Sequence, residues 1–76
     1  MVALNKIENI AFINNSIIIN INGSDVIIPL KKLSNKLKNA THIVKSMYNI
    51  SPLGSGIDWP LINEVLIAIS IIKDFG

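Results

Sequence analysis

The first third of the chain alternates between hydrophobic and polar residues as β-strands do. Within residues 16–22, alternate positions starting at residue 17 are isoleucines, namely Ile17, Ile19 and Ile21. This period of two predicts a strand with one buried face. Residues 8–13 alternate in part, and residues 25–28 resume the pattern after a turn. We therefore expect a three-stranded antiparallel β-meander.

Turn-forming residues separate these strands. Asn22-Gly23 is the strongest short-range hairpin signal, because a type I′ turn holds both central residues at positive φ, which asparagine and glycine tolerate. Asn14-Asn15 predicts the earlier turn, since asparagine accepts left-handed backbone. Pro29 cannot donate a hydrogen bond to a sheet and therefore closes the third strand.

Helical spacing begins after the meander. Leu30, Leu33 and Leu37 recur at intervals of three and four with lysines between them, which predicts one basic amphipathic helix. Thr41 is well suited to cap a short helical turn that runs through Lys45.

A second, short strand pair is expected around the loop of residues 52–56, which is rich in glycine, serine and proline. The first strand contains Tyr48 and Ile50, and the second covers residues 57–59. Pro60 ends the second strand and suits the first position of a helix, where its missing N–H would have no partner in any case.

The last hydrophobic run, residues 61–72, has two interpretations. As a terminal helical segment it carries an apolar stripe formed by Leu61, Ile62, Val65, Leu66, Ile69 and Ile72. Its opposite side is apolar as well, and a helix that is apolar all round has to be buried all round, which a small domain cannot achieve alone. Positions 65, 67, 69 and 71 also fit a period of two, as in a strand at a sheet edge. In both cases we expect the segment to pack against a second chain.

Length and composition place these elements in one domain, residues 1–76, of the α+β class. Half of the residues (50%) are hydrophobic, 16% are charged and the mean hydropathy is +0.51, which excludes a disordered chain. No run reaches the roughly 18 to 20 uninterrupted apolar residues of a membrane span. Residues 1–13 lack the layout of a secretory signal, so we expect a cytoplasmic protein.

Candidate catalytic and metal-ligating residues are sparse. The chain has no cysteine and one histidine, His42 in a polar turn, so it offers no zinc ligand set. Paired catalytic carboxylates come with polar neighbours that this segment lacks. We therefore expect structural roles for both acids, with Asp58 facing water and Glu64 stabilising the first turn of the last helix. No Gly-Lys-Ser/Thr follows the glycines of residues 54–56, which argues against a phosphate loop. We predict a non-enzymatic protein without a cofactor or metal.

The net charge of +2 comes from seven lysines, no arginine and five acids. Five of the lysines form the only charge cluster of the sequence: Lys31, Lys32, Lys36, Lys38 and Lys45. They are candidates for contacts with nucleic-acid phosphates. The absence of arginine and of interleaved aromatic residues favours a solvated helix face instead.

A set of short motifs in the second half of the chain resembles the pattern of a known family. Residues 54–60 read Gly-Ser-Gly-Ile-Asp-Trp-Pro, with Ala40-Thr41 and Tyr48 before them and Ile62-Asn63-Glu64 and Ile71-Ile72 after them. This Gly-x-Gly-Ile-x-Trp-Pro pattern resembles the small bacterial family catalogued as domain of unknown function 2442. The family usually has Asp-Glu-Asp where this chain has Asn63-Glu64-Val65, and commonly has histidine in place of Asp58.

The resemblance implies a β-meander followed by an aromatic strand, in a family without an established biochemical activity. Some members resemble partners of a small protein encoded beside them in a toxin–antitoxin arrangement. We therefore expect a protein-interaction module, antitoxin-like or regulatory, whose partner is such a protein or a second copy of the chain in a homodimer.

The candidate interface residues are Val65, Ile67, Ile69, Ile71 and Trp59. For Trp59 we favour a core position in which its indole N–H is bonded to a carbonyl, with an interface anchor as the alternative. The alternative function is a small nucleic-acid-binding regulator that uses the five lysines.

Overall fold

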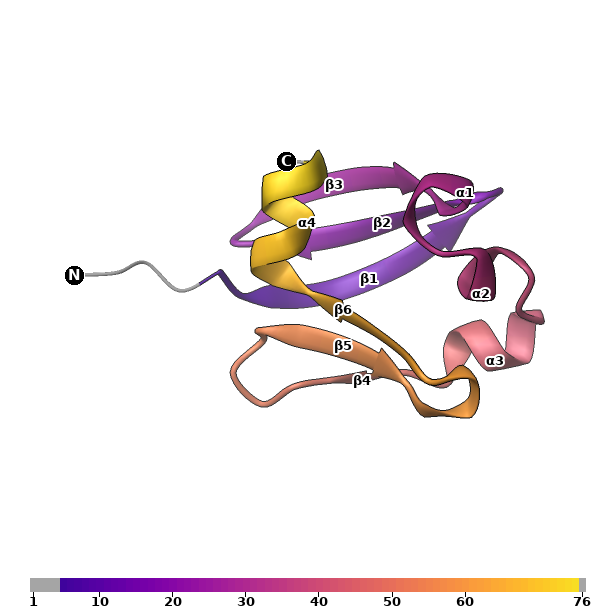
Figure 1. Ribbon diagram of the computed structural model, residues 1–76. Helices are drawn as coiled ribbons and strands as arrows, with labels where there is room; N and C mark the ends of the chain where they lie inside the picture. The colour runs from indigo at the N-terminus through magenta and orange to yellow at the C-terminus, as the bar shows by residue number, and fades with distance from the viewer. Residues whose placement is uncertain (1–4, 76) are drawn as a thin grey trace.

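Two small antiparallel sheets and short helices make up the fold of the protein, for which the computed structural model describes residues 5–75. The strand order is β1-β2-β3 in the first sheet and β4-β5-β6 in the second. In Figure 1, α1, α2 and α3 lie together at one end of the sheets, and α4 lies toward the other end. The predicted α+β class is confirmed.

The elements follow one another along the chain in this order: β1 (Ile7–Ile13), β2 (Ser16–Ile21), β3 (Ser24–Pro29), α1 (Leu30–Leu33), α2 (Asn35–Lys38), α3 (His42–Ser46), β4 (Asn49–Ile50), β5 (Gly56–Trp59), the 3-10 turn η1 (Pro60–Ile62), β6 (Glu64–Ile67) and α4 (Ala68–Phe75).

The predicted meander is present with both predicted turns. Asn22 and Gly23 have φ angles of 56° and 85°, as a type I′ turn requires, and Asn14 has a φ of 52°. Strand β2 pairs with β1 on one side and with β3 on the other. The three isoleucines expected on its inner face are all buried: Ile17, Ile19 and Ile21.

One hydrophobic cluster joins the inner faces of the two sheets. Its largest side chain is Trp59 of β5, which is 0% exposed. The indole Nε1–H donates a hydrogen bond of 3.1 Å to the carbonyl oxygen of Lys45 in α3. The ring of Phe12 from β1 meets the indole edge-on, with the ring centroids 6.4 Å apart. Trp59 is therefore a core anchor, and its side chain is not accessible to a partner.

The prediction of a single helix after the meander is wrong in one respect: the segment forms two short helices, α1 and α2. Ser34 separates them in an extended conformation, with a φ of −162° and a ψ of 119°. Its hydroxyl oxygen accepts a hydrogen bond of 3.2 Å from the N–H of Leu37 and so caps α2. A serine side chain that competes for backbone donors explains the break. Leu30 and Leu37 are both buried, as the helical spacing predicted.

The terminal segment is neither one helix nor one strand. Pro60–Ile62 form a 3-10 turn, and Asn63 ends it with a φ of 51°. This left-handed residue redirects the chain, so that Glu64–Ile67 pair with β5 as the edge strand β6. The second sheet therefore has three strands where a pair was predicted. The helix α4 begins only at Ala68, and among residues 5–75 no helix is long and apolar enough to cross a membrane.

Gly54 allows the loop between β4 and β5 to close against the start of β1. Its φ is 73°, and a Cβ atom at this position would lie 2.5 Å from Lys6 Cγ and 3.0 Å from backbone atoms of Ile7. The carbonyl oxygen of Gly54 accepts a hydrogen bond of 2.7 Å from the N–H of Ile7. The two sheets are thus joined by a backbone contact that leaves no room for a side chain.

Replacing Gly54 by alanine should lower the free energy of unfolding by about 2 to 5 kcal/mol, because a steric clash adds to the cost of positive φ. The matched control is Gly23→Ala, at a φ of 85° but with nothing within 4 Å of the added Cβ. The control should cost about 1 kcal/mol. Equilibrium unfolding in urea measures both changes, and equal losses would contradict the tight closure at Gly54.

Candidate interaction surface

Three of the five candidate interface residues are exposed. Val65, Ile67 and Ile69 have exposed fractions of 59%, 50% and 65%. Val65 and Ile67 share the outer face of β6, because side chains two positions apart on a strand point the same way. Ile71 and Trp59 are 2% and 0% exposed, so the surface contact predicted for Ile71 is wrong, and Trp59 takes the core position that was favoured for it rather than the interface alternative. The three exposed residues are termed the β6–α4 surface.

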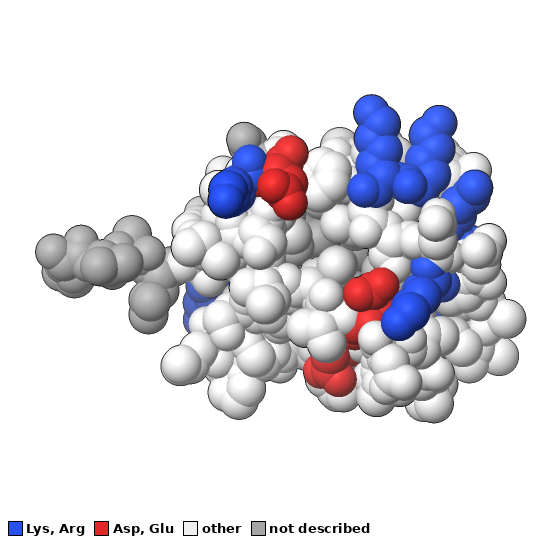
Figure 2. Space-filling model, viewed as in Figure 1, with Lys and Arg blue, Asp and Glu red and all other residues white. Residues whose placement is uncertain are grey.

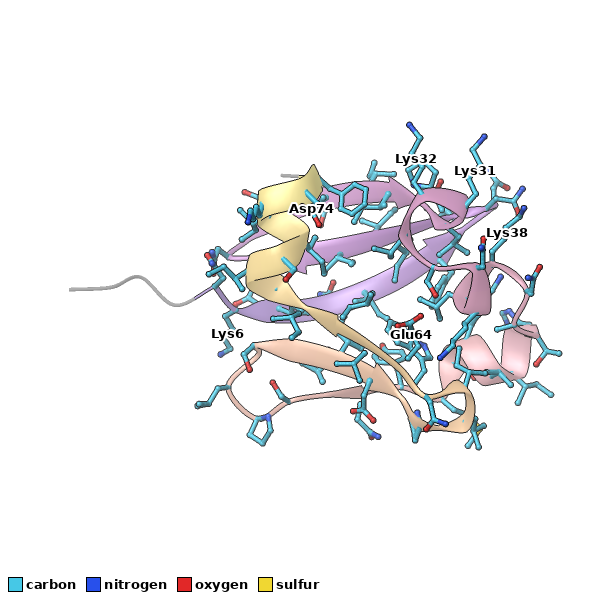
Figure 3. All side chains as sticks on the ribbon, viewed as in Figure 1. Lys6, Lys31, Lys32, Lys38, Glu64 and Asp74 are labelled. Atoms are coloured by element: carbon cyan, nitrogen blue, oxygen red, sulfur yellow. The ribbon has the colours of Figure 1, made fainter. Side chains whose placement is uncertain are left out.

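A groove of about 320 Å³ lies beside the β6–α4 surface, between α1 on one side and α4 on the other. Its lining is mostly apolar and includes Leu33, Leu66 and Phe75. Two charged residues also line it, Lys32 from α1 and Asp74 from α4, which Figure 3 shows on its two sides. The groove therefore combines an apolar floor with one charge of each sign.

Strand β6 is the free edge of the second sheet. The N–H of Ala68 donates to the carbonyl of Ser55 at 2.9 Å. Because the bonding direction alternates along an antiparallel pair, the backbone groups of Val65 and Ile67 point away from β5. The Oε1 atom of Glu64 accepts a hydrogen bond of 3.1 Å from the N–H of Val65. No other strand of residues 5–75 pairs with this edge, so it can accept an extended segment.

A hydrogen-bonded pair connects the α1–α2 segment, residues 30–38, to β6. The hydroxyl of Ser34 donates to Oε2 of Glu64 at 2.5 Å, while its oxygen accepts from the N–H of Leu37. Ser34 is buried and Glu64 is half-buried. Lys36 adds a second link, since its Nζ donates to the carbonyl of Asn63 at 3.2 Å. The Ser34–Glu64 pair, termed the clasp, holds the α1–α2 segment against β6, and sequence reasoning did not find it.

The two carboxylates near Trp59 do not form a pair. In the β5–β6 register Asp58 is opposite Val65 and Glu64 is opposite Trp59, so the carboxylates lie on opposite faces of the sheet. Asp58 is on the outer face, as predicted. Glu64 lies in a strand and bonds to Ser34, so the prediction that it serves the first turn of a helix is wrong. Among the described residues, no group of His, Asp and Glu side chains is placed to hold a metal ion.

The short helix α3 forms as predicted. The hydroxyl of Thr41 accepts a hydrogen bond of 3.2 Å from the N–H of Val44 and caps the helix. His42 occupies the first turn of this helix and is exposed, in keeping with the polar turn in which the sequence placed it.

The five candidate lysines do not share one surface. Figures 2 and 3 show lysine side chains gathered over the α1–α2 segment, where Lys31, Lys32 and Lys38 project outward. Lys36 bonds instead to a backbone carbonyl of the turn before β6. The Nζ of Lys45 lies 5.8 Å from the centroid of an aromatic ring of β1, a cation–π contact. The structure therefore brings three of the five together and separates the other two.

The outer face of the meander is a second exposed apolar surface, which the sequence reasoning missed. Ile13 and Ile27 are 52% and 67% exposed. Ala11, Ile18 and Ile27 form one row across the three strands. The signal was the unbroken isoleucine run at residues 17–19, because alternation forces its middle member to the outer face.

Comparisons with known proteins do not place the chain in a family. No protein-family model matches it. No curated protein matches it, and no solved structure does. The resemblance at residues 54–60 therefore remains a sequence-based expectation, and the function has to be inferred from the geometry of the chain itself.

Breaking the clasp should loosen the contact between the α1–α2 segment and β6. We expect Ser34→Ala to lower the free energy of unfolding by about 1 to 3 kcal/mol, because it removes the α2 cap and leaves the Glu64 carboxylate without its partner. A double-mutant cycle with Glu64→Ala, measured by urea unfolding, should give a coupling free energy above about 0.5 kcal/mol.

The control for this cycle is Ser46→Ala, which removes an exposed hydroxyl bonded to the carbonyl of Ile43 at 2.6 Å. It should change the stability much less, because water replaces an exposed hydrogen bond. Strictly additive losses for Ser34 and Glu64 would mean that the clasp contributes nothing as a pair.

Proposed function

We propose that this protein is a non-enzymatic protein-interaction module that binds its partner through the β6–α4 surface. The observation that carries the proposal is the exposure of Val65, Ile67 and Ile69, each of which has at least half of its side chain in water. Full burial of such a side chain stabilises a complex by roughly 1.5 to 3 kcal/mol. Contiguous apolar side chains on a small domain are typical of an interface.

The free edge of β6 supports a protein as the ligand. The carbonyl of Val65 and the backbone groups of Ile67 lie beside the groove, and an extended segment of a partner can pair with them as an added strand. The apolar lining suits alternate side chains of that strand. Lys32 and Asp74 on the two sides of the groove favour a segment that carries charges of both signs.

The partner that we propose is a small protein encoded nearby, with this chain as the antitoxin-like or regulatory half of the pair. The resemblance at residues 54–60 supports this choice. A second copy of the chain also fits the edge, because two β6 edges related by a two-fold axis would pair as antiparallel strands and place the Val65 and Ile67 side chains of the two copies next to one another.

The nucleic-acid alternative is supported by fewer residues than the sequence suggested. Lys31, Lys32 and Lys38 gather at one end, whereas Lys36 and Lys45 interact within the chain. Protein binding through the β6–α4 surface therefore has more support as the main function.

Charged substitutions on the β6–α4 surface should weaken association. We expect the chain to form a complex with the small protein encoded beside it or with itself. Ile67→Lys and Ile69→Glu should each weaken this complex at least about tenfold, because a buried unpaired charge replaces an apolar contact. Size-exclusion chromatography with light scattering, on the chain alone and mixed with its neighbour, measures the association.

The matched control is Ile27→Glu, because Ile27 is 67% exposed and Ile69 is 65% exposed, but Ile27 lies on β3 in the first sheet. This control should leave the complex intact. Loss of the complex through Ile27→Glu alone would move the interface to the outer face of the meander. A monomer of 8.3 kDa in both samples would refute the proposal.

A further inference from the structure

We propose that a second cavity, between the β1–β2 turn and the α1–α2 segment, binds a phosphate group. The cavity has a volume of about 390 Å³ and is lined by Asn15, Ser16, Pro29, Lys31 and Lys38. None of these residues lines the groove beside the β6–α4 surface. The site is therefore independent of the proposed protein interface.

The polar side chains that line this cavity can all donate hydrogen bonds. Lys31 and Lys38 carry ammonium groups, Asn15 carries an amide N–H₂ and Ser16 carries a hydroxyl. Within residues 5–75, the lysine side chains that interact with another residue are Lys36, which bonds to a backbone carbonyl, and Lys45, which lies over an aromatic ring. The two ammonium groups of the cavity are thus free to contact a ligand.

The distribution of charge favours an anion. No carboxylate lines the cavity. Asp25 lies at the other end of the β2–β3 hairpin, opposite Asn20, and Figure 3 shows Glu64 and Asp74 away from Lys31 and Lys38. Lys31 and Lys38 bring two positive charges to the lining, and a dianion would offset both. The groove beside β6 differs, because a carboxylate there accompanies its single lysine.

Backbone contacts hold the walls of the cavity together. The N–H of Leu30 donates to the carbonyl of Asn15 at 2.8 Å, and Ser16 is opposite Pro29 in the β2–β3 register. The N–H of Lys38 donates to the carbonyl of Ser34 at 3.0 Å. The β1–β2 turn, the end of β3 and the start of α1 are therefore connected, and Lys38 is held within α2 by its own helical hydrogen bond.

These features define the chemical class of the ligand. A lysine ammonium is a point charge with three donors, which suits a tetrahedral oxyanion without the planar geometry that arginine requires. The volume of about 390 Å³ leaves space beside a phosphate group for an organic part, and Pro29 provides an apolar wall. The phosphate can belong to a small phosphorylated molecule or to the backbone of a nucleic acid.

An NMR titration with inorganic phosphate at constant ionic strength tests the site. We expect saturable shifts of the backbone amides of Ser16, Lys31 and Lys38. The double variant Lys31→Gln/Lys38→Gln should bind phosphate at least about tenfold more weakly, because it loses two charge-assisted contacts.

The matched control is the double variant Lys6→Gln/Lys73→Gln. It removes the same net charge from two other exposed lysines, one just before β1 and one on α4, and should bind phosphate as the unaltered protein does. Thermal melting confirms that both double variants are folded. Absence of saturable shifts at the cavity, or an equal loss of affinity in both double variants, would overturn the proposal.

A short oligothymidylate distinguishes the two sources of the phosphate. Binding that is tighter than that of inorganic phosphate, depends steeply on salt and is lost in the Lys31/Lys38 variant assigns the cavity to a nucleic-acid backbone. Oligothymidylate binding that is no tighter than that of inorganic phosphate, with phosphate itself still bound, assigns it to a small phosphorylated ligand.

Discussion

The complete burial of Trp59 is the constraint on which the rest of the structure depends. The indole lies where β5, β1 and α3 meet, edge-on to Phe12 and bonded through Nε1–H to the carbonyl of Lys45. Burial of an indole removes on the order of 150 to 250 Å² from water, and its N–H has to be satisfied in the core. The second sheet therefore takes its position against the first from this contact. Because β6 pairs with β5, the position of the β6–α4 surface follows from it.

The α1–α2 segment separates the two proposed binding regions and contributes to both. Lys32 and Leu33 line the groove beside β6, whereas Lys31 and Lys38 line the phosphate cavity. Ser34, at the break between the two helices, is bonded to Glu64 of β6. In an uninterrupted helix these side chains would be spaced regularly around one helix axis. The break at Ser34 instead gives each short helix its own direction and attaches the segment to the second sheet.

Elements that depend on neighbouring residues were predictable from the sequence. The alternation in β2 and the positive φ at Asn22-Gly23 follow from local sterics and one buried face. Residues 61–72 were not predictable, because they carry both a helical and a strand period. Asn63 decided between them by taking a left-handed conformation, and pairing with β5 made the following residues a strand. That pairing is a long-range contact, and it cannot be predicted from the hydrophobic pattern alone.

The candidate site, like the fold, was only partly predictable from the sequence. By itself, the sequence determined that the chain has more apolar side chains than a small domain can bury, and that an excess lies in residues 61–72, because composition and length set the available core. Only the tertiary structure decided that Ile71 faces inward while Ile67 and Ile69 face water, and that Ser34 meets Glu64. Local spacing sets which residues share a face of one element. Which faces meet depends on strand pairing and core packing between residues far apart in the chain, and these decided where the surface, the groove and the cavity lie.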